Sequence, residues 1–339
     1  MLMPENNFKP TMYKMITPLE LIEINTTEPL HFKLNENETI VRNDRAIFDS
    51  FNSVNMGTAK VEFIQGREKA PFTYYPLLVT AQKYVEDFPT AASDVLDGVL
   101  KSLSLFKTTN TILHIGQRLM MTVDDQNMGG LVVTQGSCLL NESKGLPKYS
   151  LDVKELSTFK EYYNKFIQVF RKLNKNNRIK LGIEFYSKAS RTADIVEKFI
   201  FLSVALEILF SNESSELGYR FSNRISLLLG NDLTQRIITQ KNISKIYTKR
   251  STIVHGNVVD PPSFAEFVYL NELIRSSILQ LLSLTNEPKY SDYLSVIDSF
   301  ILKQDSIEYC EFQKQKLFFF GNLSEFKFVS LDNVMNSSL

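Results

Sequence analysis

An arginine and a histidine stand five positions apart in the segment YTKRSTIVHG, residues 247–256, and a glycine follows the histidine directly. An imidazole with a pKa near neutrality can take a proton from a ribose 2′-hydroxyl or give one to a leaving oxygen. A guanidinium can hold a phosphate with two parallel hydrogen bonds and offset the charge that develops on it during reaction. Arg250 and His255 therefore carry the groups needed to cleave RNA by internal attack, without a metal.

The spacing of the pair raises a geometric question. On an ideal helix, residues five apart lie roughly 140° from each other around the axis, so the two side chains would not share a face. Gly256 suggests a solution, because a glycine just past a helix end commonly takes the left-handed conformation. His255 would then lie in the last turn and could converge with Arg250 on one ligand. The alternative is that His255 only caps the helix and interacts with its dipole.

The chain around this pair is basic. Residues 233–259 contain no Asp and no Glu. Lys241, Lys245 and Lys249 are four residues apart, so on a helix they line one face. A basic stripe of this kind suits a phosphate backbone, and we expect it to bind RNA. A solvated helix face with cations near the carboxyl end is the other interpretation.

Composition narrows the class of protein further. The 339 residues carry 38 basic and 38 acidic side chains, so bulk charge predicts no partner. Cys138 and Cys310 fit no disulfide or metal pattern, and we expect buried thiols in a reducing compartment. The start of the chain lacks a signal peptide, and the longest apolar stretch, residues 199–210, is interrupted by Glu207. We therefore expect a cytoplasmic protein without a membrane span, and the absence of nucleotide-loop, zinc and hydrolase motifs predicts no cofactor and no metal.

The hydrophobic period divides the chain near residue 150. Before it, short β-branched runs predict strands, and one apolar stripe predicts a helix over 91–106. After it, three- and four-residue steps predict successive helices. These segments are expected as strands at 19–25, 31–34, 60–65, 111–123 and 130–140, and as helices at about 155–173, 179–190, 192–211, 215–229, 242–255, 263–284 and 289–302.

The fold class predicted from this pattern is α+β. Residues 1–150 would form a β-rich mixed domain, residues 151–302 an all-helical domain, and residues 303–339 a tail of uncertain structure. Ser263, after Pro261 and Pro262, is the expected N-cap of one long helix. In the tail, KLFFFGNLSEFKFVS has the pattern of a hairpin or of a segment docked on a partner.

Residues from Arg178 to Ile301 contain three segments that together resemble the HEPN superfamily, and within it the Apea-like HEPN domains. The first is IEFYSKASRTADIVEKFIFLSVALEILF, whose ALE signature includes Glu207. The second is ELGYRFSNRISLLLG, with Arg220 and Arg224, and the third is IYTKRSTIVHG. The order of the segments and the spacing between them also fit the family.

The resemblance implies a helical bundle that dimerises, so that two Arg–His motifs form one composite ribonuclease site. Arg250 and His255 would be its catalytic pair. Ser251 would take the auxiliary polar position after the arginine, where the best-understood enzymes of the superfamily often have Asn, Asp or His. A glutamate in so apolar a helix should be paired, and we expect Glu207 to pair structurally with Arg220 or Arg224.

Family context suggests a role in bacterial antiphage defence. Apea-like HEPN proteins occur in abortive-infection systems, where cleavage of host or phage RNA arrests growth. On this view the protein is a toxin-like RNase that acts on tRNA, mRNA or rRNA. Residues 1–150, which lie outside the resemblance, would sense a phage-derived trigger or bind a regulatory protein. The alternative is a non-catalytic dimerisation or RNA-binding module whose N-terminal domain carries the partner interaction.

Overall fold

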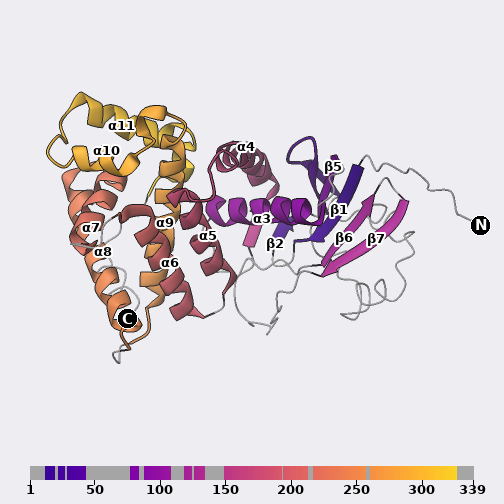
Figure 1. Cartoon of the computed structure of the whole chain (residues 1–339), viewed down its shortest axis with the longest axis horizontal. Helices are drawn as coiled ribbons and strands as arrows, with labels where there is room; N and C mark the ends of the chain where they lie inside the picture. The colour runs from indigo at the N-terminus through magenta and orange to yellow at the C-terminus, as the bar shows by residue number, and fades with distance from the viewer. Residues whose placement is uncertain are drawn as a thin grey trace, which may run out of the picture. The chain divides into compact units, whose positions relative to one another are not determined.

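The protein combines β-strands with α-helices, as Figure 1 shows. A computed structural model describes residues 12–19, 22–26, 29–42, 77–83, 88–107, 118–123, 126–133, 149–192, 194–212, 217–256 and 260–326. Every strand in these ranges precedes Val153, and helices dominate the described chain after that residue. The mixed α and β content expected from the sequence is therefore confirmed.

The chain forms two compact units, each made of two segments. The first unit comprises residues 1–100 and 113–164, and the second comprises 101–112 and 165–339. Helices α3 (Phe88–Phe106) and α4 (Val153–Phe170) contribute residues to both. The domain division expected from the sequence, with boundaries near 150 and 302, stays a prediction.

The first unit contains a six-stranded antiparallel sheet in the order β3-β4-β5-β1-β6-β7. Its strands are β1 (Met12–Pro18), β3 (Leu30–Lys33), β4 (Glu38–Arg42), β5 (Leu77–Lys83), β6 (Arg118–Val123) and β7 (Gln126–Val133). A separate parallel pair joins β2 (Ile22–Asn25) to β8 (Tyr149–Asp152). The sequence did not predict β1, β4, β5 or β8, and the strand expected at 60–65 lies outside the described residues.

Helix α4 begins directly after β8, and its first twelve residues belong to the first unit. Its predicted apolar stripe is confirmed, because Leu156, Phe159 and Tyr163 are all buried. The Tyr163 hydroxyl donates a 2.5 Å hydrogen bond to the buried carboxylate of Glu38 on β4. This bond gives the buried acid a partner and fixes α4 against that strand.

The second unit is helical. Its elements are α5 (Arg178–Arg191), α6 (Ile195–Phe210), α7 (Leu217–Leu229), α8 (Leu233–Val254), α9 (Phe264–Leu284), η2 (Pro288–Tyr290), α10 (Tyr293–Ser299), α11 (Ile307–Phe318) and η3 (Gly321–Ser324). Helix α9 is central, since every residue from Leu273 to Leu284 is buried and α5, α6, α7 and α11 all pack against it. Its predicted N-cap is confirmed, because Ser263 and Glu266 form a reciprocal capping box.

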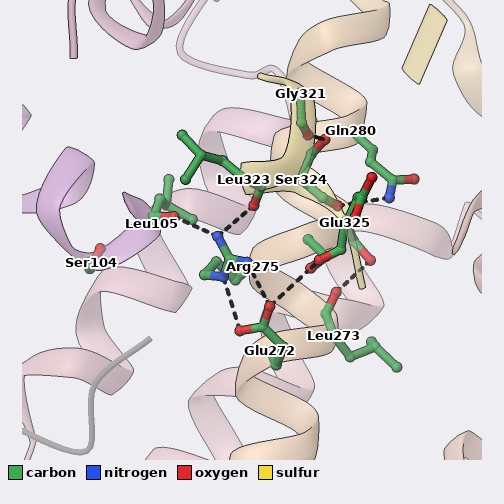
Figure 2. Close-up of polar contacts among 12 residues, drawn as sticks. Ser104, Leu105, Glu272, Leu273, Arg275, Gln280, Gly321, Leu323, Ser324 and Glu325 are labelled. Atoms are coloured by element: carbon green, nitrogen blue, oxygen red, sulfur yellow. Dashed lines mark hydrogen bonds and ion pairs between the residues drawn. The ribbon is translucent and has the colours of Figure 1, made fainter. Parts of the chain in front are cut away.

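Arg275 of α9 ties two distant segments of the second unit together, as Figure 2 shows. Its guanidinium forms two hydrogen bonds with Glu272, at 3.0 and 2.6 Å. The remaining amino group donates to the carbonyls of Leu105, at the end of α3, and Leu323, in η3. The buried cation therefore has a counter-ion and donates to carbonyls of two segments that are distant in the sequence, which makes it a structural residue.

The C-terminal part of the second unit differs from expectation. Residues 307–318 form helix α11 and residues 321–324 a 3-10 turn, so the segment is not a hairpin as far as Phe326. Cys310 lies on the exposed side of α11, so the expectation of a buried thiol there is wrong. The reason is the helical period, which buries Tyr309 and Phe312 and turns Cys310 outward. Cys138 lies outside the described residues.

Candidate functional site

The C-terminal end of α8 has the geometry expected from its glycine. The last helical residue is Val254, and His255 is the C-cap, with φ −85° and ψ 7°. Gly256 has φ +69°, in the left-handed region, as predicted. A Cβ at Gly256 would meet nothing within 4 Å, so the backbone conformation alone favours glycine there.

Helix α8 begins nine residues before the predicted start at 242. Asp232 is its N-cap, and the Asp232 side chain accepts a hydrogen bond from the backbone N–H of Gln235 at 2.9 Å. One face of the helix is buried through Arg236, Thr239, Ile243 and Ile246. Because these positions recur every three or four residues, the same stripe reaches Arg250 in the next turn. Arg250 is therefore aimed toward the bundle.

Arg250 pairs with Glu207 of α6. Arg250 Nη2 lies 3.1 Å from Glu207 Oε2, and the two side chains are 23% and 29% exposed. The expected pairing of Glu207 with Arg220 or Arg224 is wrong, because α6 packs against α8 in a way that brings together residues 43 positions apart. Burial raises the pKa of the Glu207 carboxyl, and the positive charge of Arg250 opposes that rise.

Arg224 of α7 has a different partner. Its Nε and Nη2 form a bidentate pair with the carboxylate of Asp298 in α10, at 2.7 and 2.6 Å. Its Nη1 donates to the carbonyl of Phe210 and to the side chain of Asn212, at the C-terminal end of α6. Arg224 is therefore structural, as the sequence suggested, but it joins α6, α7 and α10 rather than neutralising Glu207. Arg220 lies on the exposed side of α7.

Most donors of the Arg250 guanidinium have no acceptor among the residues that the structure describes. Nη2 binds Glu207, whereas Nε is buried without a hydrogen-bond acceptor in the described structure. The His255 side chain is exposed, and within the described residues no hydrogen bond joins it to Arg250. The two groups thus lie at the same helix end without forming a pre-assembled pair in one chain.

The predicted basic stripe is partly presented to solvent. Lys241 and Lys245 are exposed on α8, one helical turn apart. Lys249 is mostly buried, and its amino group lies 3.9 Å from the carboxylate of Glu266 at the start of α9. Ser251, the expected auxiliary group, is half-buried. Two of the three lysines are therefore placed to meet a polyanion directly.

The described ranges contain no candidate metal site and no candidate membrane span beside the Arg–His segment. No group of three or more His, Cys, Asp or Glu is placed there to hold a metal ion. His31 is exposed on β3, and His114 lies outside the described residues. No described helix has both the length and the apolar character needed to cross a bilayer.

Comparison of the chain with protein-family models, with curated proteins and with solved structures gives no match, so the resemblance to the HEPN superfamily depends on the three sequence segments alone.

Proposed function

We propose that the protein is a metal-independent endoribonuclease of the HEPN type that acts as a homodimer. In this proposal residues 151–302 form the HEPN-like bundle, and the β-rich residues 1–150 carry the sensor. The observation that supports it best is the end of α8, where a partly exposed arginine with unused donors and an exposed histidine precede a left-handed glycine.

Each residue has a definite role in the proposed reaction. His255 takes the proton of a ribose 2′-hydroxyl, and the 2′-oxygen attacks the adjacent phosphorus. The bond from phosphorus to the 5′-oxygen breaks, and the leaving oxygen receives a proton from an imidazolium, which is either the protonated His255 or the same residue of the second subunit. The products are a 2′,3′-cyclic phosphate and a 5′-hydroxyl end. Arg250 offsets the charge on the phosphate oxygens, and Lys241 and Lys245 hold the flanking backbone.

The pairing of Arg250 with Glu207 is compatible with phosphate binding. A single hydrogen bond between side chains that retain a quarter of their exposure contributes about 1 kcal/mol or less. An incoming phosphodiester can therefore bind Nη1, which is not among the buried unsatisfied atoms, or replace the carboxylate. In one chain no hydrogen bond joins Arg250 to His255 within the described residues. We propose that a second subunit supplies a facing Arg–His pair and completes the site.

A second candidate function is a non-catalytic dimerisation or RNA-binding module. The same Glu207 contact favours it, since a carboxylate beside the guanidinium repels the phosphate that catalysis needs. In this case the lysines of α8 would bind RNA and residues 1–150 would carry the partner interaction. Loss of His255 would then leave the function intact.

The biological setting follows from the resemblance and is also proposed. A cytoplasmic ribonuclease of this branch would act as a toxin-like effector in antiphage defence, with tRNA, mRNA or rRNA as its substrate. A phage-derived trigger or a regulatory protein would act through residues 1–150.

Sequencing of RNA ends tests the proposal and identifies the substrate together. Wild type and His255→Ala are expressed in bacteria, and 5′-hydroxyl and cyclic-phosphate ends are mapped. Wild type should produce new ends at defined sites, and His255→Ala should not. His31→Ala is the matched control, because it removes an exposed histidine from the sheet and should cut as wild type does. Equal cleavage by His255→Ala and wild type would reject the catalytic proposal in favour of the module.

A further inference from the structure

The other end of α8 borders a pocket that the proposed ribonuclease reaction does not use. It has a volume of about 850 Å³ and lies between the start of α8, the segment after α10, and α11. Ligand pockets for small molecules typically have volumes of 300–1,000 Å³. The residues that matter most for its chemistry are Asp232, Arg236, Asp305 and Lys314.

Arg236 is a buried cation in the pocket wall, and it has no acidic partner in the part of the chain that the structure describes. The residue is 8% exposed, and its guanidinium lies 5.0 Å from the ring centre of Tyr309. Nε donates to the carbonyl of Gly230 at 3.3 Å, and Nη1 donates to the side chain of Gln304. Among the described residues Nη2 has no hydrogen-bond partner. A Cβ at Gly230 would lie 2.7 Å from the Arg236 side chain, so glycine is required for this close approach.

A second buried cation lies behind the same wall. The amino group of Lys316 donates to the carbonyl of Leu228 and, at 3.4 Å, to the side chain of Asn231, which also lines the pocket. Burial, and then the charge of Arg236, lower the pKa of Lys316 to about 7. The C-terminal end of α7 offers only about half a negative charge to these two cations. The wall therefore carries excess positive charge whenever Lys316 is protonated.

The rest of the lining suits a ligand that is more than an anion. The pocket lining includes three exposed apolar side chains, Leu233, Ile301 and Leu302. A planar or aliphatic group of a ligand could pack against them. Asp232 and Asp305 present carboxylates, which accept hydrogen bonds from hydroxyl groups. Neither forms an ion pair with Arg236 or Lys316 in the described structure.

We propose that this pocket binds a nucleoside monophosphate. The phosphate would bind Arg236 Nη2 and Lys314, the ribose hydroxyls would donate to the two carboxylates, and the base would cover the apolar side chains. A guanidinium edge and an ammonium group match a phosphate, whereas the carboxylates and apolar groups account for the nucleoside. The pocket is distinct from the Arg250–His255 end of α8, so the inference stands independently of the proposed cleavage.

Titration calorimetry with AMP tests the pocket. AMP should bind the full-length protein, and inorganic phosphate or adenosine alone should bind more weakly. Lys314→Glu reverses the charge of an exposed residue in the pocket lining without disturbing the core. This substitution should weaken the binding of AMP about tenfold. Lys175→Glu, an exposed control in the turn before α5, should change the affinity less than twofold. His255→Ala should bind AMP as wild type does, whatever its effect on RNA.

The remaining outcomes of the calorimetry also test the nucleotide assignment. No binding of AMP, GMP, CMP or UMP at millimolar concentration would overturn the inference, and so would equal weakening by Lys314→Glu and Lys175→Glu. Equal binding of inorganic phosphate and AMP would reduce the pocket to an anion site and overturn the nucleotide assignment. Displacement of AMP by a 5′-phosphorylated dinucleotide, but not by its 5′-hydroxyl form, would identify RNA ends as the source of the same phosphate chemistry.

Discussion

Arg224 and Arg250 belong to the same helical unit and each pairs with a carboxylate, but they differ in how completely they are used. All three nitrogens of the Arg224 guanidinium have acceptors, namely both oxygens of Asp298, a carbonyl and an amide oxygen. Within the described residues Arg250 has one acceptor, Glu207, and its buried Nε has none. Both were singled out from sequence, yet their surroundings assign them different roles.

The contrast separates a structural arginine from one available to a ligand. A guanidinium with every donor satisfied contributes to the fold and has nothing left to bind a phosphate. A guanidinium with an unsatisfied buried donor costs free energy until a ligand or water supplies the acceptor. Arg250 is therefore the better candidate for phosphate binding, and the comparison can be tested at each residue.

The largest expected effect is on catalysis at Arg250. Arg250→Ala should lower the rate of RNA cleavage by about 100- to 1,000-fold, because the developing charge on the phosphate loses its donor. Unfolding in urea should change by about 1 kcal/mol or less, since the pair with Glu207 is partly exposed. Single-turnover cleavage of a labelled RNA measures the rate, and Arg171→Ala, in the exposed turn after α4, is the control. Unchanged cleavage by Arg250→Ala would favour the binding module.

Arg224 should show the opposite pattern. Arg224→Met should lower the free energy of unfolding by about 3 kcal/mol, because a carbonyl and an amide oxygen lose their donors in the buried interior. Asp298 is 38% exposed and can be solvated, which limits the loss. Urea denaturation gives the free energy. A loss below about 1 kcal/mol would show that the bidentate pair is not the structural centre we infer.

The sequence predicted local features of these sites better than their long-range contacts. The glycine at the end of α8 and the serine cap of α9 were predictable, because each depends on a few neighbouring residues. The partners of Arg224 and Arg250 lie 74 and 43 positions away, and a helical period does not reveal which helices cross. The expected pairing within one sequence neighbourhood failed for that reason.

The start of α8 and the pocket beside it were missed for related reasons. The segment LTQRIITQK contains β-branched residues that weaken the helical pattern, although Asp232 was a usable N-cap signal. Arg236 was visible as one basic residue of an acid-free segment. Its pocket also needs α11, more than sixty residues later, which sequence periodicity could not place.

The glycine after His255 offers a smaller, purely conformational test of the Arg250 region. Gly256→Ala should destabilise the protein by about 1 kcal/mol, since an L-residue is strained at φ +69° and a Cβ there meets no neighbour. Gly256→Asn should lose less stability than Gly256→Ala, because asparagine tolerates the left-handed region. Urea denaturation of the three proteins gives the order Gly, Asn, Ala. Equal stability of all three would mean that the cap conformation contributes nothing.

The smallest expected effect is the pH dependence of the Glu207 contact. Burial raises the pKa of Glu207 above its ordinary value near 4.5, so the folded protein binds more protons than the unfolded chain just above that pH. This contribution to stability is fully present below pH 4.5 and is lost as the pH rises through the folded pKa. The stability of wild type relative to Glu207→Gln should therefore fall as the pH rises from about 4.5 toward neutrality.

Glu308, at the start of α11, provides the matched control of opposite sign. A backbone hydrogen bond, and then the Ser306 hydroxyl, lower the pKa of Glu308, so its contribution is present above the unfolded pKa and is lost as the pH falls. The stability of wild type relative to Glu308→Gln should thus rise with pH over the acidic range, while the difference for Glu207→Gln falls. If both differences rose with pH, the charge of Arg250 would outweigh burial at Glu207, and the pair would resemble the strong structural bridge of Arg224.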